Sequence, residues 1–385
     1  MKLHDCHNIS DLRRIAQQRL PAPMFNYLDG GADDEWTLRR NTRAFDDYEL
    51  LPAQLRGVAE VDATTPLLGL KLDWPVFLAP TGMSRLFHHD AEPAVARAAA
   101  KFGTLYSLST VATTRLEDVA ALTTGPKMFQ LYIFKDRGVT IEFVQRCKAA
   151  GYAALCLTVD TAMAGNRERD KRSGMILPPK WTAASWWSFA THPGWSLRAL
   201  LRPGFELANI SHRVPAANTS MSLFDFINGQ FDRSVTWQDA EWLVRQWDGP
   251  VVIKGVLSPA DAQHAVGIGA RGIMISNHGG RQLDGTPAPV DCVRPIRDRI
   301  GGALDVIVDG GVQRGTHVIK ALALGASACS IGRSYLYGLA AGGQAGVERA
   351  LEILRNEVLL DMTLLGVRSI SEITAEHIQH RPGRW

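Results

Sequence analysis

The sequence lacks the cysteine patterns of a disulfide framework or a zinc site. It has 5 cysteines, an odd number, and none of them belongs to a C-x-x-C pair. Buried free thiols explain this distribution, and free thiols persist in a reducing compartment. The sequence therefore predicts no disulfide scaffold and no metal site.

Long apolar runs are also missing. No uncharged apolar stretch approaches the roughly 20 residues that a membrane-spanning helix needs. The first residues, MKLHDCHNIS, are polar and lack the apolar centre of a secretory signal. We therefore expect a cytoplasmic protein.

An excess of charge of one sign is absent as well. The 42 Lys and Arg residues are nearly balanced by 39 Asp and Glu residues, and no long basic run occurs. Nucleic acid is therefore not an expected partner. With 46% hydrophobic and 21% charged residues, the composition is that of a globular protein with a large core.

Short apolar runs that stop at Gly, Pro or polar residues predict eight β-strands. Each run is nearly continuous in apolar residues, as is typical of parallel strands that are buried on both faces. The predicted strands are 75–80, 104–110, 128–133, 153–160, 250–255, 272–278, 305–310 and 328–333.

Helix signals lie between the later strands. Thr236 with Asp239 is a capping pair, and Ser258 followed by Pro259 is a second helix start. Alternating strands and helices predict a closed (β/α)₈ TIM barrel, with an open doubly wound sheet as the alternative. We expect one domain, 1–385, with an N-terminal helical cover over 1–70 and a barrel over 71–385. A long excursion over 161–235 interrupts the barrel after its fourth strand.

Polar residues or glycines follow at the end of every predicted strand. In such barrels the catalytic residues lie where the strands end, although any one of these residues could serve an ordinary turn. The last two strand ends, DGG and GR, are typical of a phosphate site. The strand-end residues are Pro80, Thr81, Gly82, Ser109, Gln130, Tyr132, Thr158, Asp160, Lys254, Ser276, His278, Asp309, Gly310, Gly311, Gly332 and Arg333.

His278 and two arginines suggest chemistry on an anionic substrate. An imidazole can take a proton near neutral pH, and the two glycines after His278 let the backbone approach a ligand. Arg281 and Arg167 could hold a carboxylate in bidentate fashion. The alternatives are a structural histidine at a turn and, for Arg167, an exposed charge in a mixed run.

Lys254 ends an apolar strand, where a buried ammonium needs an anionic or electron-rich partner. A cofactor could be that partner, and a Schiff-base lysine is the alternative.

Several long motifs resemble the FMN-dependent enzymes that oxidise 2-hydroxy acids. This family includes glycolate oxidase, the respiratory L-lactate dehydrogenases, mandelate dehydrogenase and flavocytochrome. The resemblance covers nearly the whole chain. Its motifs are FNYLDGGADDEWTLRRN, FQLYIFKDRG, LTVDTAMAGNRERD, VVIKGV, SNHGGRQLDG and DGGVQRGTHVIKALALGA.

The resemblance implies roles for the candidate residues. His278 would be the base, and Asp160 would stabilise its charged form. Arg167 and Arg281 would clamp the substrate carboxylate, and Tyr27 and Tyr132 would contact the substrate.

The resemblance also implies an FMN site. Lys254 would lie near the flavin N1 and C2 carbonyl, which removes the Schiff-base alternative. The expected flavin and ribityl contacts are Pro80, Thr81, Gly82, Ser109, Gln130, Thr158 and Ser276. Gly311, Gly332 and Arg333 would hold the phosphate, and Asp309, Gly310 and Gln313 are the other expected cofactor-binding residues.

Two positions depart from the family pattern. Gln313 stands where relatives usually carry arginine, so the phosphate site loses one charge; Arg314 could compensate, and we expect Arg333 and backbone N–H groups to hold the phosphate. Val111 stands where glycolate oxidase has a tryptophan, which predicts a roomier pocket and disfavours glycolate.

We therefore expect an (S)-2-hydroxy acid dehydrogenase, with L-lactate as the preferred substrate and mandelate as the alternative. Quinone is the preferred electron acceptor, with cytochrome or O₂ as alternatives. A homotetramer is implied by the resemblance. The alternatives of a different class are a non-redox isomerase or lyase and a non-catalytic flavin-binding protein.

Residues 181–203 are rich in tryptophan. Tryptophan with arginine suits a bilayer interface, so this segment predicts attachment to the inner face of the cytoplasmic membrane. The alternative is a lid or a subunit contact. The residues concerned are Trp181, Trp186, Trp187, Trp195, Arg198 and Arg202.

Overall fold

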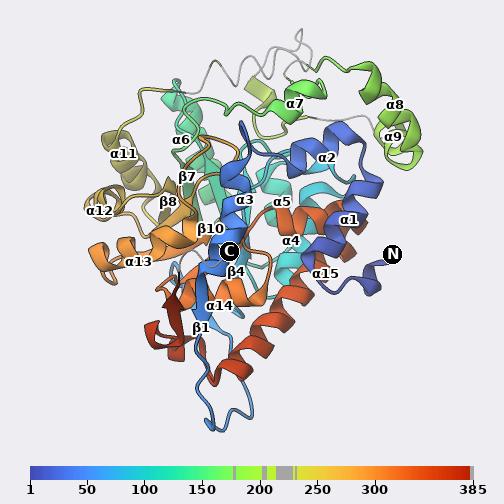
Figure 1. The fold of residues 1–385 in the computed structure, drawn as a ribbon. Helices are drawn as coiled ribbons and strands as arrows, with labels where there is room; N and C mark the ends of the chain where they lie inside the picture. The colour runs from blue at the N-terminus through green and yellow to red at the C-terminus, as the bar shows by residue number, and fades with distance from the viewer. Residues whose placement is uncertain (177–178, 202–205, 214–228, 230–231, 382–385) are drawn as a thin grey trace.

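The computed structural model describes residues 1–385 except 177–178, 202–205, 214–228, 230–231 and 382–385. Eight parallel strands close into a barrel (Figure 1), which confirms the predicted (β/α)₈ fold and excludes the open sheet. Every predicted strand is present, with bounds that differ from the prediction by at most two residues at either end. The strands are β4 (Val76–Leu78), β5 (Tyr106–Ser109), β6 (Lys127–Leu131), β7 (Ala154–Thr158), β8 (Val251–Val256), β9 (Gly272–Ser276), β10 (Asp305–Asp309) and β11 (Ala328–Ile331).

The barrel interior has its own apolar core. Inward-facing residues such as Phe77, Met128 and Met274 are fully buried there, and they form a cluster separate from the core between strands and helices. A hairpin of β2 (Thr65–Leu67) and β3 (Leu70–Leu72) closes the N-terminal end of this core with Leu67 and Leu72. The N-terminal end is therefore sealed, and the opposite end remains for chemistry.

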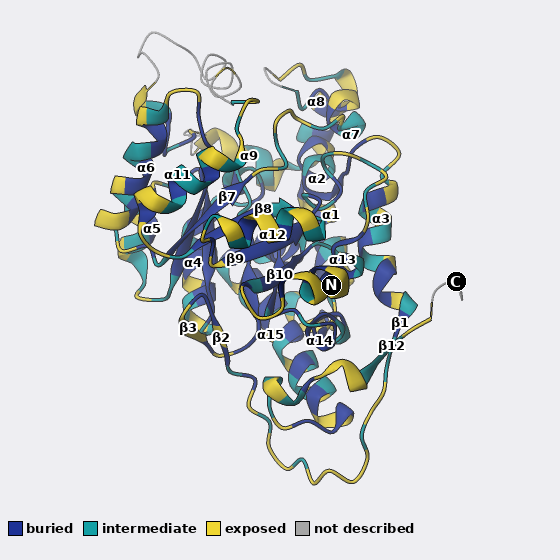
Figure 2. Cartoon of the chain, turned by 90° about the vertical axis from the view of Figure 1, so that its left-hand side faces the viewer, coloured by how far each residue is buried: buried dark blue, intermediate teal, exposed yellow. Residues whose placement is uncertain are grey.

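Helices surround the strands, which Figure 2 shows as a buried centre. The two predicted helix starts are confirmed, because Thr236 forms a capping box with Asp239 and the Ser258 side chain accepts from the Asp261 N–H. The helices after the strands are α4 (Ala91–Lys101), α5 (Leu116–Leu122), α6 (Arg137–Ala149), α11 (Trp237–Trp247), α12 (Pro259–Gly267), α13 (Pro289–Ile300), α14 (Gly315–Ala323) and α15 (Arg333–Leu365), with the 3₁₀ turn η3 (Ser84–Leu86) before α4.

The N-terminal segment is largely helical, as predicted, and packs beside the C-terminal helix (Figure 1). Its first strand pairs antiparallel with the last strand of the chain, so that Tyr48 lies opposite His380. The elements are η1 (Leu3–Asp5), α1 (Ile9–Arg19), α2 (Ala22–Asp29), α3 (Trp36–Arg43), η2 (Ala44–Asp47) and β1 (Tyr48–Leu50), with η5 (Ile370–Glu372), η6 (Ala375–His377) and β12 (Ile378–His380) at the other end.

The excursion after β7 contains short helices in its described parts. These are α7 (Glu168–Arg172), α8 (Ala183–Thr191), α9 (Pro193–Leu201) and the 3₁₀ turn η4 (Ser211–Arg213). Helix α8 packs on α2, where the Ser188 hydroxyl accepts from the Ala22 N–H at 2.8 Å. Helix α8 of the excursion therefore lies against the N-terminal cover.

A buried carboxylate connects the cover, the excursion and the last helix. Asp29 is 5% exposed and accepts two hydrogen bonds from Arg13, at 2.6 and 2.8 Å. It also accepts from Arg169 at 3.0 Å and from the Tyr337 hydroxyl at 2.8 Å. Burial alone would raise the pKa of Asp29, but Arg13 and Tyr337 hold it below its ordinary value.

We predict that Asp29→Asn lowers the free energy of unfolding by about 2 kcal/mol at pH 7, because charge-assisted hydrogen bonds from partly exposed arginines are lost. The wild-type contribution is complete above the ordinary pKa of 3.8 and is lost as the pH falls through the lower folded-state pKa. The difference in the free energy of unfolding between the wild type and Asp29→Asn should therefore be smaller in acid than at pH 7. Urea unfolding at both pH values measures it. The exposed Asp34→Asn is the control, and an equal effect of both changes would contradict the assignment.

Candidate functional site

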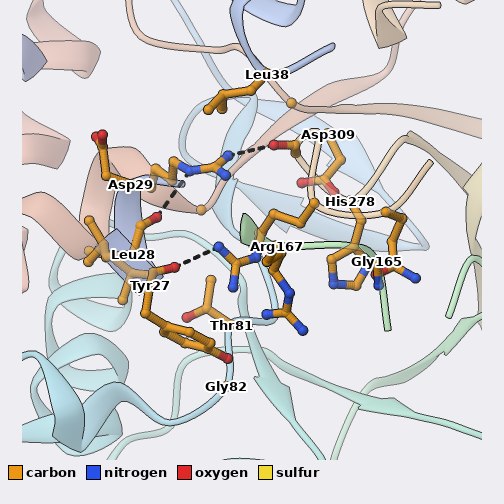
Figure 3. Close-up of a pocket in the computed structure, with 18 of the residues that line it drawn as sticks. Tyr27, Leu28, Asp29, Leu38, Thr81, Gly82, Gly165, Arg167, His278 and Asp309 are labelled. Carbon is orange, nitrogen blue, oxygen red and sulfur yellow. Dashed lines mark hydrogen bonds between the residues drawn. The ribbon is translucent and has the colours of Figure 1, made fainter. Parts of the chain in front are cut away.

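A cavity of about 880 Å³ opens at the C-terminal ends of the barrel strands. Figure 3 shows the side chains of Tyr27, Arg167 and His278 around it. The structure thus brings together candidates that are far apart in the sequence. The candidates that line the cavity are Tyr27, Pro80, Thr81, Gly82, Ser109, Gln130, Tyr132, Thr158, Arg167, Lys254, His278, Arg281, Asp309, Gly310, Gly311, Gln313, Gly332 and Arg333.

Asp160 and Ser276 are the candidates outside the lining, and they lie directly behind it. An Asp160 carboxylate oxygen is 2.9 Å from Nδ1 of His278. Burial alone would raise the pKa of Asp160, but His278 and Lys254 hold it below the ordinary value. The carboxylate thus accepts from Nδ1–H of the imidazole and leaves Nε2 as the proton acceptor.

The loop that carries His278 has a left-handed backbone. His278 has φ 57°, and the two following glycines have φ 65° and 73°. The approach of a ligand to these glycines stays a prediction, and the structure adds that other parts of the protein also approach them closely. A Cβ on Gly279 would lie 2.6 Å from an Arg333 guanidinium nitrogen, and one on Gly280 would lie 2.5 Å from the Leu38 nitrogen of α3. The glycines therefore let the His278 loop pack against the cover.

Two guanidinium groups flank Tyr27. The Cζ atoms of Arg281 and Arg167 lie 4.7 and 5.6 Å from the centroid of its ring. Burial and the charge of Arg167 lower the pKa of Arg281 to about 10. In the described part of the chain Arg281 donates to the carbonyls of Tyr27 and Gly30 and forms no ion pair. Arg167 pairs with Asp170 at 3.7 Å, so the two guanidinium groups and this one carboxylate leave a net positive charge that favours an anionic ligand.

Gln282 holds the two arginine-bearing loops together. Its Nε2 donates to the carbonyls of Asp160 and Met163 at 2.8 and 2.7 Å, and its Oε1 accepts from the Gly165 N–H at 3.0 Å. The sequence analysis missed this residue, although its place next to Arg281 in the SNHGGRQLDG motif was a usable signal.

Lys254 lies in a hydrogen-bonded group that joins neighbouring strands. Its Nζ is 2.9 Å from an Asp309 carboxylate oxygen and donates to the Ser276 hydroxyl at 3.0 Å. That hydroxyl donates to Asp309 at 2.7 Å, and Ser330 donates to the other oxygen. Burial opposes the ammonium charge, but Asp309 raises the pKa of Lys254 above its ordinary value. A permanently charged lysine thus lines the cavity.

Next to this lysine, the cavity offers donors that suit a flavin ring. Gln130 is buried, and its Oε1 accepts from the Ser109 hydroxyl at 3.0 Å. Its Nε2 is buried without a hydrogen-bond partner among the described residues. An amide donor near a fixed positive charge matches the carbonyl and nitrogen edge of an isoalloxazine.

The other end of the cavity suits a phosphate. Gly332 caps α15, whose N-terminal N–H groups favour an anion, and Gly311 follows β10 beside it. The Arg333 guanidinium donates to the carbonyls of Leu28, Gly30 and Gly279. Arg314 forms an ion pair with Glu357 at 2.8 Å and does not line the cavity, so it does not replace the charge absent at Gln313.

Apolar residues also line the cavity, and of these only Val111 was singled out from the sequence. Phe87 comes from the turn after β4, and its ring stacks with that of Tyr27 at 6.3 Å. Leu207 comes from the excursion and is 1% exposed. Neither has a distinctive local pattern in the sequence.

Comparisons with known proteins agree with this geometry. A family model described as FMN-dependent dehydrogenase matches residues 16–380. Glycolate oxidase 1 of Zea mays is 41% identical over 96% of this chain and 95% of its own length. A putative L-lactate dehydrogenase of Mycobacterium tuberculosis is 42% identical over 96% of this chain and 88% of its own length.

A solved structure, that of the monotopic membrane protein (S)-mandelate dehydrogenase, superposes with a TM-score of 0.94. It is 33% identical, and the match covers 98% of this chain and all of that one. The charged lysine, the amide donor and the phosphate end of the cavity fit the cofactor of these relatives. The chain belongs to the FMN-dependent dehydrogenase family and is an FMN-dependent enzyme that oxidises 2-hydroxy acids.

Proposed function

We propose that the substrate is a small (S)-2-hydroxy acid, with L-lactate as the first candidate, which is oxidised to the 2-oxo acid. The observation that carries this proposal is one cavity lined by His278, which pairs with Asp160, and by two arginines whose charge exceeds that of their one partner, Asp170. A base and a carboxylate clamp are the groups that this oxidation requires.

The residues divide the work as follows. Arg281 and Arg167 bind the substrate carboxylate, and the Tyr27 ring lies beside both guanidinium groups. His278 accepts a proton from the substrate at Nε2, and Asp160 stabilises the imidazolium that forms. Burial and the charge of Asp160 raise the pKa of Tyr132 to about 12, so its hydroxyl stays protonated and can donate to the substrate. FMN supplies the acceptor for the two electrons.

L-Mandelate is the second candidate substrate. The superposition with a mandelate dehydrogenase favours it, as do the apolar wall residues Phe87, Val111 and Leu207, which suit a ring better than a polar group. Quinone is the proposed electron acceptor, with cytochrome or O₂ as alternatives. Assembly as a homotetramer stays a prediction.

Anaerobic spectroscopy tests the proposal. The flavin absorbance of the purified protein is recorded while L-lactate, L-mandelate and glycolate are added in turn. We expect bleaching by lactate or mandelate and not by glycolate. A flavin band that none of the acids bleaches would overturn the proposed substrate class.

The hairpin of α8 and α9 supports attachment to a membrane surface. Trp186 and Trp187 are 62% and 73% exposed, and Leu200 is 76% exposed. Exposed apolar side chains in one hairpin are typical of an interfacial anchor. Within the described residues no helix is long and apolar enough to cross a bilayer. We therefore propose that the hairpin lies on the inner face of the cytoplasmic membrane.

Two of the four tryptophans do not take part in this surface. Trp195 donates from Nε1 to the Leu86 carbonyl at 2.9 Å, and Trp181 packs edge-on against Phe189. Arg198 is exposed on α9, and Arg202 lies outside the described residues. The expectation that all four rings face a bilayer was therefore too broad.

The base assignment predicts the behaviour of His278→Gln. This variant should bind FMN normally but reduce it about 10³-fold more slowly with the preferred acid, because a positioned base is lost. Anaerobic stopped-flow measurement of flavin bleaching checks this rate. His264→Gln, an exposed histidine on α12, is the control. A loss of less than tenfold would contradict the role of His278.

The membrane proposal predicts that Trp186→Ser with Trp187→Ser weakens binding to anionic vesicles by at least tenfold, because two interfacial rings are removed. Cosedimentation with phosphatidylglycerol vesicles measures the effect. Leu360→Ser with Leu364→Ser is the control, since these exposed residues lie in the last turns of α15 and not in the α8–α9 hairpin. Equal binding of the wild type and the double tryptophan variant would refute the anchor.

A further inference from the structure

We propose that Leu207 determines which substrate side chains the cavity accepts, and that Asn209 is the residue that positions it. This inference rests on the proposed function, because it concerns the wall against which the hydroxy acid side chain lies. It assigns to the returning limb of the excursion, residues 206–213, a part in substrate selection.

Leu207 belongs to a continuous apolar wall. It lines the cavity together with Val111 of the loop between β5 and α5. A Cβ on Gly82 would lie only 2.4 Å from a Val111 methyl carbon, so Val111 covers the end of β4. The neighbouring Ala208 donates its N–H to the Ala112 carbonyl at 3.2 Å, which places Leu207 beside Val111.

Asn209 fastens this limb to the barrel. It is fully buried, although it is polar and lies in a long connection. Its Oδ1 accepts from the Leu116 N–H at 2.8 Å, and its Nδ2 donates to the Thr114 carbonyl at 3.2 Å. One side chain therefore satisfies both the first N–H of α5 and a carbonyl of the preceding loop.

A second layer of charged contacts supports the same limb. Arg146 on α6 donates to the Asn209 carbonyl at 3.0 Å and is itself held by Glu117 at 2.6 and 3.0 Å. On the same helix Glu142 accepts from His212 and Arg213 of η4. The limb is thus attached to α5 and α6, so the position of Leu207 is set by the barrel helices.

The wall has a chemical consequence for the substrate. A buried surface of leucine, valine and phenylalanine excludes a polar or charged side chain, which would lose hydrogen bonds to water there. The size of Leu207 sets how far an apolar side chain can extend. The two candidate acids, L-lactate and L-mandelate, differ in that dimension.

The test compares Leu207→Ala with the wild-type holoenzyme. Binding of pyruvate and of benzoylformate, the two 2-oxo acid products, is measured from the perturbation of the flavin absorbance, which needs no turnover. We expect the ratio of the Kd for pyruvate to the Kd for benzoylformate to rise about tenfold, since apolar groups in a pocket change affinity by this order. The ratio of kcat/KM for mandelate and lactate should move in the same direction.

Ile210→Ala is the matched control. Ile210 is 1% exposed, lies on the same limb and does not line the cavity, so its truncation removes similar apolar volume away from the substrate. Its Kd ratio should stay within twofold of the wild type. A Leu207→Ala ratio that also stays within twofold would overturn the inference, whereas binding without flavin reduction by any acid would overturn only the proposed function.

Asn209 is tested by conservative and disruptive changes. Asn209→Ala should shift the Kd ratio in the direction of Leu207→Ala, because the limb loses both of its side-chain hydrogen bonds. Asn209→Asp keeps the acceptor for the Leu116 N–H but loses the donor to the Thr114 carbonyl, so its Kd ratio should lie between those of Asn209→Ala and the wild type. Equal ratios for Asn209→Ala and the wild type would show that Asn209 does not position the wall.

Discussion

The buried ion pair of Lys254 and Asp309 is the contact on which the site depends. The ammonium is at the end of β8 and the carboxylate at the end of β10, while Ser276 on β9 bonds to both. Strands β9 and β10 pair in the register that places Asp309 opposite Ser276. A slip of one residue would leave a charge buried without its partner, which costs several kcal/mol. Barrel closure and charge compensation therefore stabilise each other, and the flavin pocket forms around them.

Much of the fold and of the site could be predicted because the signals are local. Lys254, Ser276 and Asp309 each end a short apolar run, so each could be assigned to the same edge of the barrel without knowledge of its partners. Asn209 and Gln282 could not be found in this way. Their side chains bond to backbone groups more than 90 positions away in the sequence, such as the carbonyls of Thr114 and Asp160. No periodicity or spacing encodes contacts of that kind.

The N-terminal cover is part of the site and not only a lid on it. Gly280 must be glycine because α3 packs on its Cα, and Arg333 is held by carbonyls of Leu28 and Gly30. The local sequence indicated conformational freedom next to His278 but not which group approaches there. The position of His278 thus depends on residues 28–38 as much as on β9. A segment that positions a side chain of the cavity is constrained more tightly than its place outside the barrel implies.

The excursion shows how one connection can serve two surfaces. Leu200 and Leu207 are the same residue type seven positions apart, yet one is 76% exposed and the other 1% exposed. Hydropathy cannot separate them, because the difference arises from the bonds of Asn209 and Ala208 to the loop before α5. A substitution at a strand end would remove a side chain on which the cavity depends. A wall residue on a long connection can be substituted without disturbing the barrel. The proposed determinant of substrate choice therefore lies where the fold tolerates variation, and the proposed catalytic residues lie where it does not.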